Sequence, residues 1–81
     1  MRVLLVEDEA PLRETLAARL KRDGFAVDSA GDGEEGLYLG REVPFDVAVI
    51  DLGLPRMSGL ELVQKLRGEG KKYPILILTA R

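Results

Sequence analysis

The chain has 81 residues, of which 46% are hydrophobic and 32% charged, and its formal net charge is −2. This length suits one small domain, and the slightly acidic balance argues against a basic nucleic-acid-binding face. Without cysteine or histidine, the chain cannot form disulfides, thiolate metal sites or histidine-based catalytic centres. The first apolar run stops at Glu7, which is too early for a signal peptide or a membrane span, so we expect a cytoplasmic protein.

Strand-like and helix-like segments alternate along the first part of the chain. A strand is predicted over residues 3–6, and the acidic residues Glu7, Asp8 and Glu9 follow it. Pro11 fits the first turn of a helix, and Gly24 fits its end. Apolar residues of this helix recur at helical spacing, at Leu12, Leu16, Ala17 and Leu20. A second, partly polar strand over residues 26–30 has the composition of an edge strand.

Two further helices begin at residues whose side chains can cap them. Asp32 with Glu35, and Ser58 with Glu61, have the spacing of a capping box. The helix after Asp32 is expected to be weak, because each of its glycines costs about 1 kcal/mol against alanine in a helix interior. Leu37 is expected to face the core from this helix.

The two remaining strands are strongly apolar. Residues 47–50 form a continuous apolar run that ends at Asp51, as in a strand buried on both faces, and residues 75–79 (ILILT) form the last strand. Strands that start about 20 to 30 residues apart, with a helix between them, fit right-handed βαβ units. The sequence therefore predicts an α/β fold with a doubly wound parallel sheet.

Acidic residues follow the first and third strands, whose carboxyl ends meet at one edge of a parallel sheet. Asp8 and Asp51 are therefore expected within a few ångströms of each other. Two carboxylates 5 Å apart repel by about 3 kcal/mol at an effective dielectric constant of 20. A divalent cation resolves this conflict, and an all-oxygen donor set that includes the carbonyl of Gly53 favours Mg²⁺.

The same arrangement predicts a chemistry. Asp51 could attack a phosphoryl donor and form an aspartyl phosphate while Mg²⁺ neutralises the developing charge, and Thr79 could donate a hydrogen bond to the transferred group. Each residue alone has another interpretation. Glu7 and Asp8 could be solvated loop acids, Thr79 could cap a strand end, and Asp51 could cap the following turn.

Three stretches together resemble the receiver domain of bacterial two-component response regulators: VLLVEDE, DVAVIDLGLPRMSG and PILILTAR. The resemblance covers residues 1–81 and implies a flavodoxin-like receiver, truncated after the fourth strand, with strand order 2-1-3-4. It implies that Asp51 is the phosphoacceptor and that Thr79 is the switch hydroxyl. It also implies that Mg²⁺ is bound by Asp8, by Asp51 and by the carbonyl of Gly53, with Glu7 acting through a water molecule.

The resemblance also implies partners. A sensor histidine kinase would donate the phosphoryl group, and the chain would be a phosphoacceptor that assists its own phosphoryl transfer rather than an enzyme. The DLGLP and LTAR segments are most similar to receivers that precede a winged-helix domain in transcription factors. Control of transcription and DNA binding would then depend on a C-terminal output domain outside these 81 residues, and no membrane contact is expected.

The sequence departs from the receiver pattern at its carboxyl end. Receivers have five strands and five helices, with a lysine after the fifth strand, whereas Lys71 and Lys72 precede the fourth strand at the opposite end of the sheet. The fourth strand would be an apolar edge strand, so we expect either an excerpt of a longer chain or a homodimer formed by edge-strand pairing or domain swapping. Two other functions stay open. One is a dimerisation or interaction module that does not switch, and the other is an aspartate phosphatase, although Gly53 replaces the acid such enzymes use.

Overall fold

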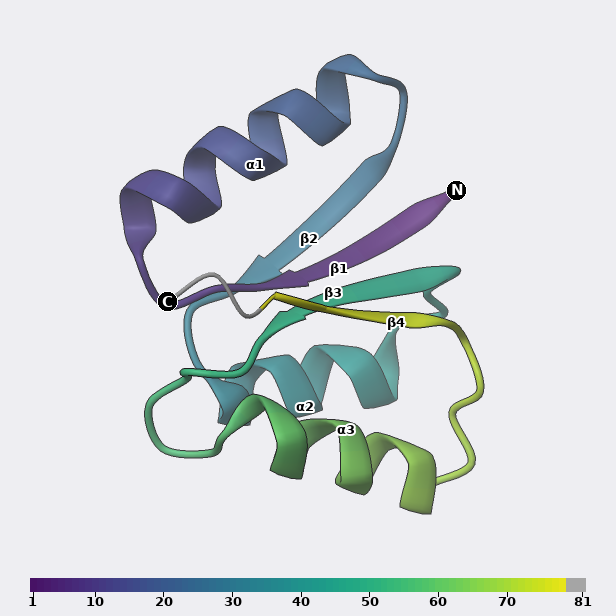
Figure 1. Ribbon diagram of the computed structural model, residues 1–81. Helices are drawn as coiled ribbons and strands as arrows, with labels where there is room; N and C mark the ends of the chain where they lie inside the picture. Colours follow the sequence, from purple (N-terminus) through teal and green to yellow (C-terminus); the bar gives the residue numbers. More distant parts are fainter. Residues whose placement is uncertain (79–81) are drawn as a thin grey trace.

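The computed structural model describes residues 1–78, in which four strands alternate with three helices (Figure 1). The strands are β1 (Arg2–Val6), β2 (Ala26–Ala30), β3 (Val47–Asp51) and β4 (Ile75–Leu78). The helices are α1 (Ala10–Arg22), α2 (Gly33–Glu42) and α3 (Gly59–Gly68). All of these elements were predicted from the sequence. Thr79, the last residue of the predicted fourth strand, lies outside the described residues.

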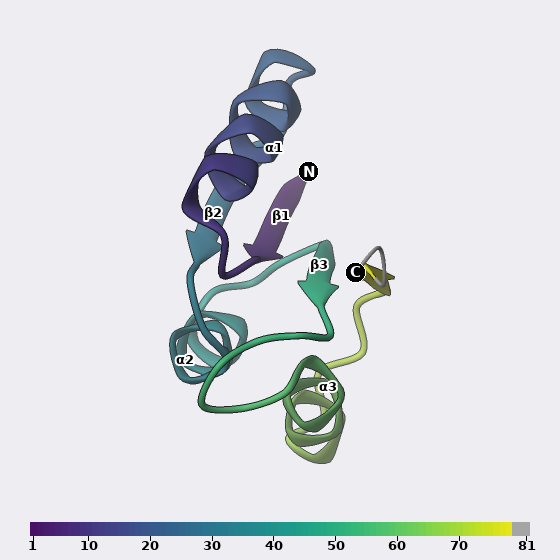
Figure 2. The same cartoon turned by 60° about the vertical axis from the view of Figure 1, so that its left-hand side comes forward.

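The strands form one parallel sheet in the order β2-β1-β3-β4, which confirms the predicted fold class and strand order. Helix α1 lies on one face of the sheet, and α2 and α3 lie side by side on the other (Figures 1 and 2). In the sheet register, Val6 is level with Ala30 and Ile50, and Asp51 is level with Leu78. The carboxyl ends of β1 and β3 therefore finish next to each other, with the loops that follow them at the same edge.

The hydrophobic core lies between the sheet and the pair α2 and α3. Strands β1 and β3 contribute Leu4, Val6 and Ile50, and α3 contributes Leu62 and Leu66, all of them fully buried. These apolar residues alternate along the strands, because successive side chains of a strand point to opposite faces. The core thus fixes which face of β1 and β3 meets α3, and with it the direction in which each strand end points.

The glycines of α2 lie against neighbouring elements. Helix propensity, on which the prediction of a weak helix was based, does not include such contacts. A Cβ atom added at Gly33 would lie 2.4 Å from the carbonyl oxygen of Met57, and one added at Gly36 would lie 3.0 Å from a methyl group of Val6. At Gly40 it would lie 2.8 Å from a methyl group of α3. The loss of helix propensity is therefore offset by a close approach of α2 to β1 and α3 that a larger side chain would prevent.

Helix α1 packs less completely than its apolar spacing predicts. Ala17 is buried and Leu16 and Leu20 are half-buried, but Leu12 is 41% exposed. The reason is that α1 is the one described helix on its face of the sheet, so part of its apolar stripe has no neighbour there (Figure 2). Gly24 follows the helix with a φ of +97°, which confirms the predicted stop signal.

The ends of α2 and α3 and the start of β4 are held together by polar contacts. Arg41 of α2 makes a bidentate ion pair with Glu69, with Nε to Oε1 and Oε2 distances of 2.7 and 2.9 Å. The hydroxyl of Tyr73 donates a hydrogen bond of 3.0 Å to the carbonyl of Gly40. Arg67 donates to the carbonyl of Tyr73 at 2.8 Å, which anchors the segment that leads into β4. Within residues 1–78, no helix is both long enough and apolar enough to cross a membrane.

Candidate metal centre

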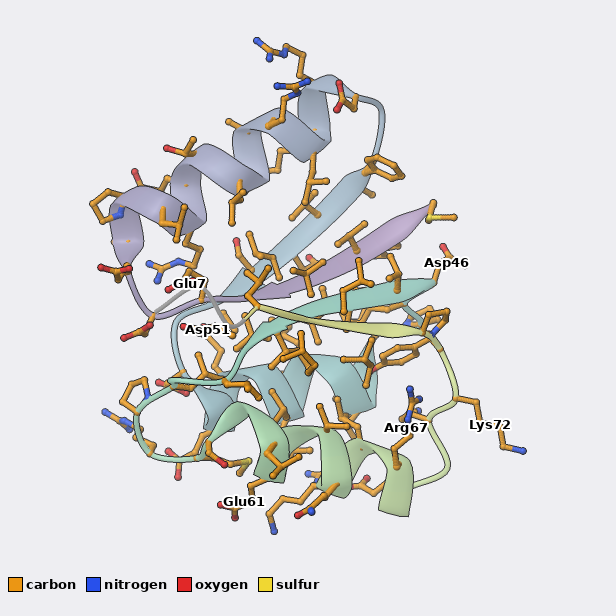
Figure 3. The ribbon with its side chains drawn as sticks, in the orientation of Figure 1. Glu7, Asp46, Asp51, Glu61, Arg67 and Lys72 are labelled. Atoms are coloured by element: carbon orange, nitrogen blue, oxygen red, sulfur yellow. The ribbon has the colours of Figure 1, made fainter. Side chains whose placement is uncertain are left out.

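Three acidic side chains meet where β1 and β3 end. Glu7 directly follows β1 and is 1% exposed, and Asp51 is the last residue of β3 and is 2% exposed (Figure 3). Asp8 comes next in the chain after Glu7 and is half-buried. Each of the three offers a carboxylate oxygen, and these oxygens all lie within 4.8 Å of one another. This is the arrangement that the parallel order of the strands predicted.

Hydrogen bonds to the backbone hold Glu7 in this position. Its N–H donates to the carbonyl of Ala30 at the end of β2, at 3.1 Å, so β2 fixes the chain just beyond the end of β1. Its carboxylate accepts a hydrogen bond of 2.9 Å from the N–H of Glu9 through Oε2. The Glu7 carboxylate is therefore oriented by its own loop.

The loop that follows Asp51 returns sharply to the strand end. The N–H of Gly53 donates to Oδ1 of Asp51 at 3.3 Å, and the N–H of Gly59 donates to the carbonyl of Leu52 at 3.1 Å. A Cβ atom at Gly59 would lie 2.3 Å from the carbonyl oxygen of Asp51, which is an impossible contact. Glycine is thus required at position 59 for the start of α3 to lie against the last residue of β3.

A strained residue in the same loop connects it to α2. Arg56 has a φ of +69°, a left-handed conformation that costs a non-glycine residue about 1 to 2 kcal/mol. The N–H of Met57 donates to the carbonyl of Pro55 at 2.7 Å, which closes a tight turn around Arg56. The guanidinium of Arg56 lies 3.3 Å from Glu34 and 3.8 Å from Asp32, at the beginning of α2. The turn thus brings Arg56 next to two acids at the start of α2.

The donor set of the acid cluster fits a hard divalent cation. Two carboxylate charges within 4.8 Å of each other repel by about 3.5 kcal/mol or more at an effective dielectric constant of 20, and a cation between them offsets that repulsion. The available donors are oxygens, and Mg²⁺ binds through one or two carboxylates while keeping several waters. The partly exposed Asp8 leaves one side of the cluster open to solvent.

The structure brings some of the predicted site residues together and leaves others apart from the site or undescribed. Glu7, Asp8 and Asp51 are brought together as expected. Gly53 contributes its N–H to Asp51, and the predicted role of its carbonyl as a metal ligand stays a prediction. Thr79 lies outside the described residues. Lys72 lies at the opposite end of the sheet from Glu7 and Asp51, in agreement with the prediction that it cannot reach the site (Figure 3).

Sequence reasoning did not single out Arg13, which lies in the first turn of α1. Its Nη1 atom donates to the carbonyl of Glu7 at 2.9 Å and lies 3.5 Å from the carbonyl oxygen of Asp8. A signal was present in the sequence. Arg13 occupies the start of a helix that follows the acidic loop, and side chains of a helix lean toward its N-terminus.

The fold and the acid cluster define a class of protein, and comparison with known proteins agrees. The chain belongs to the response regulator receiver domain family, which it matches over residues 3–81. It is 58% identical over its full length to the two-component response regulator PhoP of Pseudomonas aeruginosa, and 46% identical to the transcriptional regulatory protein PhoP of Escherichia coli. It spans about a third of these relatives, covering 36% of each.

Solved structures of the response regulator TrrA have the same fold. The crystal structure of TrrA from Thermotoga maritima in complex with Mg²⁺ and BeF matches 99% of this chain and 70% of that chain, with a TM-score of 0.92 and 36% identity. TrrA in complex with the histidine kinase ThkA matches 98% of this chain and 68% of that chain, with a TM-score of 0.89 and 37% identity.

Proposed function

We propose that this chain is the phosphoacceptor part of a two-component signalling switch, in which Asp51 accepts a phosphoryl group from the phosphohistidine of a sensor histidine kinase. The observation that carries the proposal is the cluster of Glu7, Asp8 and Asp51 within 4.8 Å at the ends of two adjacent parallel strands. Family membership and the complex of TrrA with a histidine kinase support the choice of donor.

The proposed transfer starts at a carboxylate oxygen of Asp51. This oxygen bonds to phosphorus as the P–N bond to the kinase histidine breaks, and the electron pair of that bond goes to the imidazole nitrogen, which then takes up a proton. Asp8 and Asp51 would hold Mg²⁺ directly, with Glu7 acting through a water molecule and the Gly53 carbonyl as a further ligand. When bound, the ion neutralises the charge that develops on the phosphoryl oxygens. Thr79 would donate its hydroxyl to the transferred group.

The chain's own residues prepare this step. The buried Asp51 carboxylate accepts a hydrogen bond from the N–H of Gly53, which fixes its orientation. Burial of Asp51 and Glu7 at the sheet edge excludes bulk water from one side of the site. In this role the chain is a reactant that assists its own phosphorylation, and we propose that it is not an enzyme that turns over a substrate.

In a longer form of the protein, phosphorylation would control transcription. The relative from E. coli is named a transcriptional regulatory protein, and the chain covers 36% of it. DNA would then be bound by a C-terminal domain outside this chain, in the cytoplasm. The alternative of an interaction module without switching is not favoured, because the acid cluster that phosphorylation requires is assembled.

A homodimer is also proposed for the 81-residue chain. Among the described residues no strand pairs with the outer edge of β4, and Leu76 and Ile77 of that strand are 60% and 39% exposed. Such an apolar edge favours pairing with a second copy, by edge-strand pairing or by domain swapping. Light scattering should give a dimer for the wild type and a monomer for Leu76→Lys, and a wild-type monomer would contradict the proposal.

Phosphorylation is tested by incubating the chain with acetyl phosphate and Mg²⁺. We expect a mass increase of one phosphoryl group in the wild type that is sensitive to hydroxylamine, as an acyl phosphate is, and that is absent with EDTA. Asp51→Asn should abolish it. Asp46→Asn is the matched control, because Asp46 lies at the opposite end of the sheet (Figure 3). Equal modification of Asp51→Asn and the wild type would contradict the proposed function.

A further inference from the structure

Arg13 reaches back from the first turn of α1 to the loop that carries two of the clustered acids. A side chain in this position leans toward the helix N-terminus, which is why it can contact residues that precede the helix. Its Nη1 atom donates to the carbonyl of Glu7 at 2.9 Å and lies 3.5 Å from the carbonyl oxygen of Asp8. The guanidinium therefore contacts the backbone that determines where these two carboxylates point.

The structure also makes room for this guanidinium. A Cβ atom added at Gly31 would lie 3.1 Å from Nη1 of Arg13 and 3.6 Å from its Cζ, so the absence of a side chain at position 31 leaves room for the guanidinium beside the chain after β2. Just before it, the carbonyl of Ala30 accepts the N–H of Glu7 at 3.1 Å. The residue that begins the acidic loop is thus held at its N–H by β2 and at its carbonyl by α1.

We propose that Arg13 is a positioning residue for the metal centre. By holding the backbone of Glu7 and Asp8, it places their carboxylates against Asp51. This inference rests on the proposed function, since it concerns the affinity of that site for Mg²⁺. Arg13 acts through the loop and not through contact with the ion.

Two effects of the Arg13 side chain on Mg²⁺ binding have opposite signs. As a nearby positive charge, the guanidinium repels a cation, so removing it would tighten Mg²⁺ binding if charge were its one influence. As a support for the ligands, it strengthens binding, so removing it weakens binding. The direction of the change in Mg²⁺ affinity therefore separates the positioning role from that of a bystander charge.

The test compares Mg²⁺ titrations of Arg13→Met and Arg19→Met with the wild type, followed by calorimetry and by amide chemical shifts. Both substitutions remove one positive charge from α1, but Arg19 is exposed and paired at 3.3 Å with Asp23, the C-cap residue of this helix. We expect the Kd for Mg²⁺ to rise about tenfold in Arg13→Met, as when an outer partner of a metal ligand is removed, and to stay within about twofold in Arg19→Met.

One further measurement and two further variants keep the test independent of fold stability. In the metal-free chain, hydrogen exchange of the Glu7 and Glu9 amides should quicken in Arg13→Met while that of Ile50 in β3 stays slow. Gly31→Ala displaces the guanidinium without removing it and should raise the Kd by a smaller factor. Arg13→Lys keeps the charge and can still donate hydrogen bonds, so it should retain part of the Mg²⁺ affinity that Arg13→Met loses.

The outcomes are distinct. A Kd in Arg13→Met that is unchanged or lower, beside a wild type that binds Mg²⁺, overturns the positioning role and leaves the proposed function standing. A wild type that binds Mg²⁺ no better than Asp51→Asn overturns the proposed function itself. Weaker binding in Arg13→Met with faster exchange at Glu7 supports the positioning role.

Discussion

The end of the sheet where the strands begin and the end where β1 and β3 finish differ in how their charges are arranged. Where the strands begin, charges of opposite sign meet, as Arg2 does with Asp28 at 2.7 Å and Arg41 with Glu69. Where β1 and β3 end, three carboxylates of like charge lie within 4.8 Å. Ion pairs at the first end add modest stability, whereas the carboxylates at the second end repel one another. The proposed function lies at the second end, where the three carboxylates gather.

The largest expected effect is at Gly59, where the loop after Asp51 is closed by contact between backbone atoms. Gly59→Ala should destabilise the chain by about 3 kcal/mol, because the added Cβ would overlap the Asp51 carbonyl and force the backbone apart. Urea unfolding followed by circular dichroism measures this loss. Gly68→Ala is the control, since among the described residues no atom beyond its chain neighbours and its own helix backbone lies within 4 Å of its added Cβ, and it should be neutral or slightly stabilising. Equal effects of the two substitutions would contradict the tight closure of the loop.

Next in size is the effect of Mg²⁺ on stability, which should be confined to the acidic end. At ten times its Kd, Mg²⁺ should add about 1.4 kcal/mol to the free energy of unfolding, because it binds the folded chain and not the unfolded one. Asp51→Asn should lose this increment and Asp46→Asn should keep it. Thermal unfolding with and without Mg²⁺ gives the comparison. An increment that survives in Asp51→Asn would place the ion elsewhere.

At the end of the sheet where the strands begin, Tyr73 tests how much the polar contacts contribute to the free energy of unfolding. Its hydroxyl donates to the carbonyl of Gly40, and its ring packs edge-on against Phe45, with centroids 6.2 Å apart. Tyr73→Phe keeps the ring and removes the hydrogen bond, so the free energy of unfolding should fall by about 1 kcal/mol. Tyr38→Phe alters an exposed ring on α2 and should have almost no effect in the same urea titration.

The smallest effect concerns the ion pair between Arg41 and Glu69, both exposed to solvent. The hydrogen bond from Arg41 holds the pKa of Glu69 below its ordinary value. A lowered pKa in the folded state means that the stabilisation is complete above the ordinary carboxyl pKa and is lost as the pH falls through the lowered one. Glu69→Gln should therefore slightly lower the urea concentration at the midpoint of unfolding at pH 7, and it should have no effect on that midpoint at pH 2. A difference that is as large at pH 2 as at pH 7 would exclude the ion pair as its source.

Much of the difference between the two ends of the sheet could be predicted from the sequence. Apolar runs that end in an acid located the strands and the edge at which Asp8 and Asp51 meet, because parallel strands finish together. Arg13 was not assigned in the same way, since its place in the first helical turn shows only that it can reach the loop, and a solvated arginine there would have the same sequence pattern. The glycine at position 33 was interpreted as a weakness for a similar reason. Propensity is a local property, and the contact of Gly33 with Met57 exists only in the folded chain.

The order of the strands also determines when the acid cluster can exist. Asp8 and Asp51 are about 40 residues apart in the chain, and β1 pairs with β3 only after the intervening loop has closed. The neighbouring contact between β1 and β2 closes a shorter loop and can form earlier. The repulsion between Asp51 and the two acids after β1 therefore depends on the pairing of β1 with β3. The acid cluster opposes folding through this repulsion, but the pairing of β1 with β3 that assembles it does not involve the carboxylates.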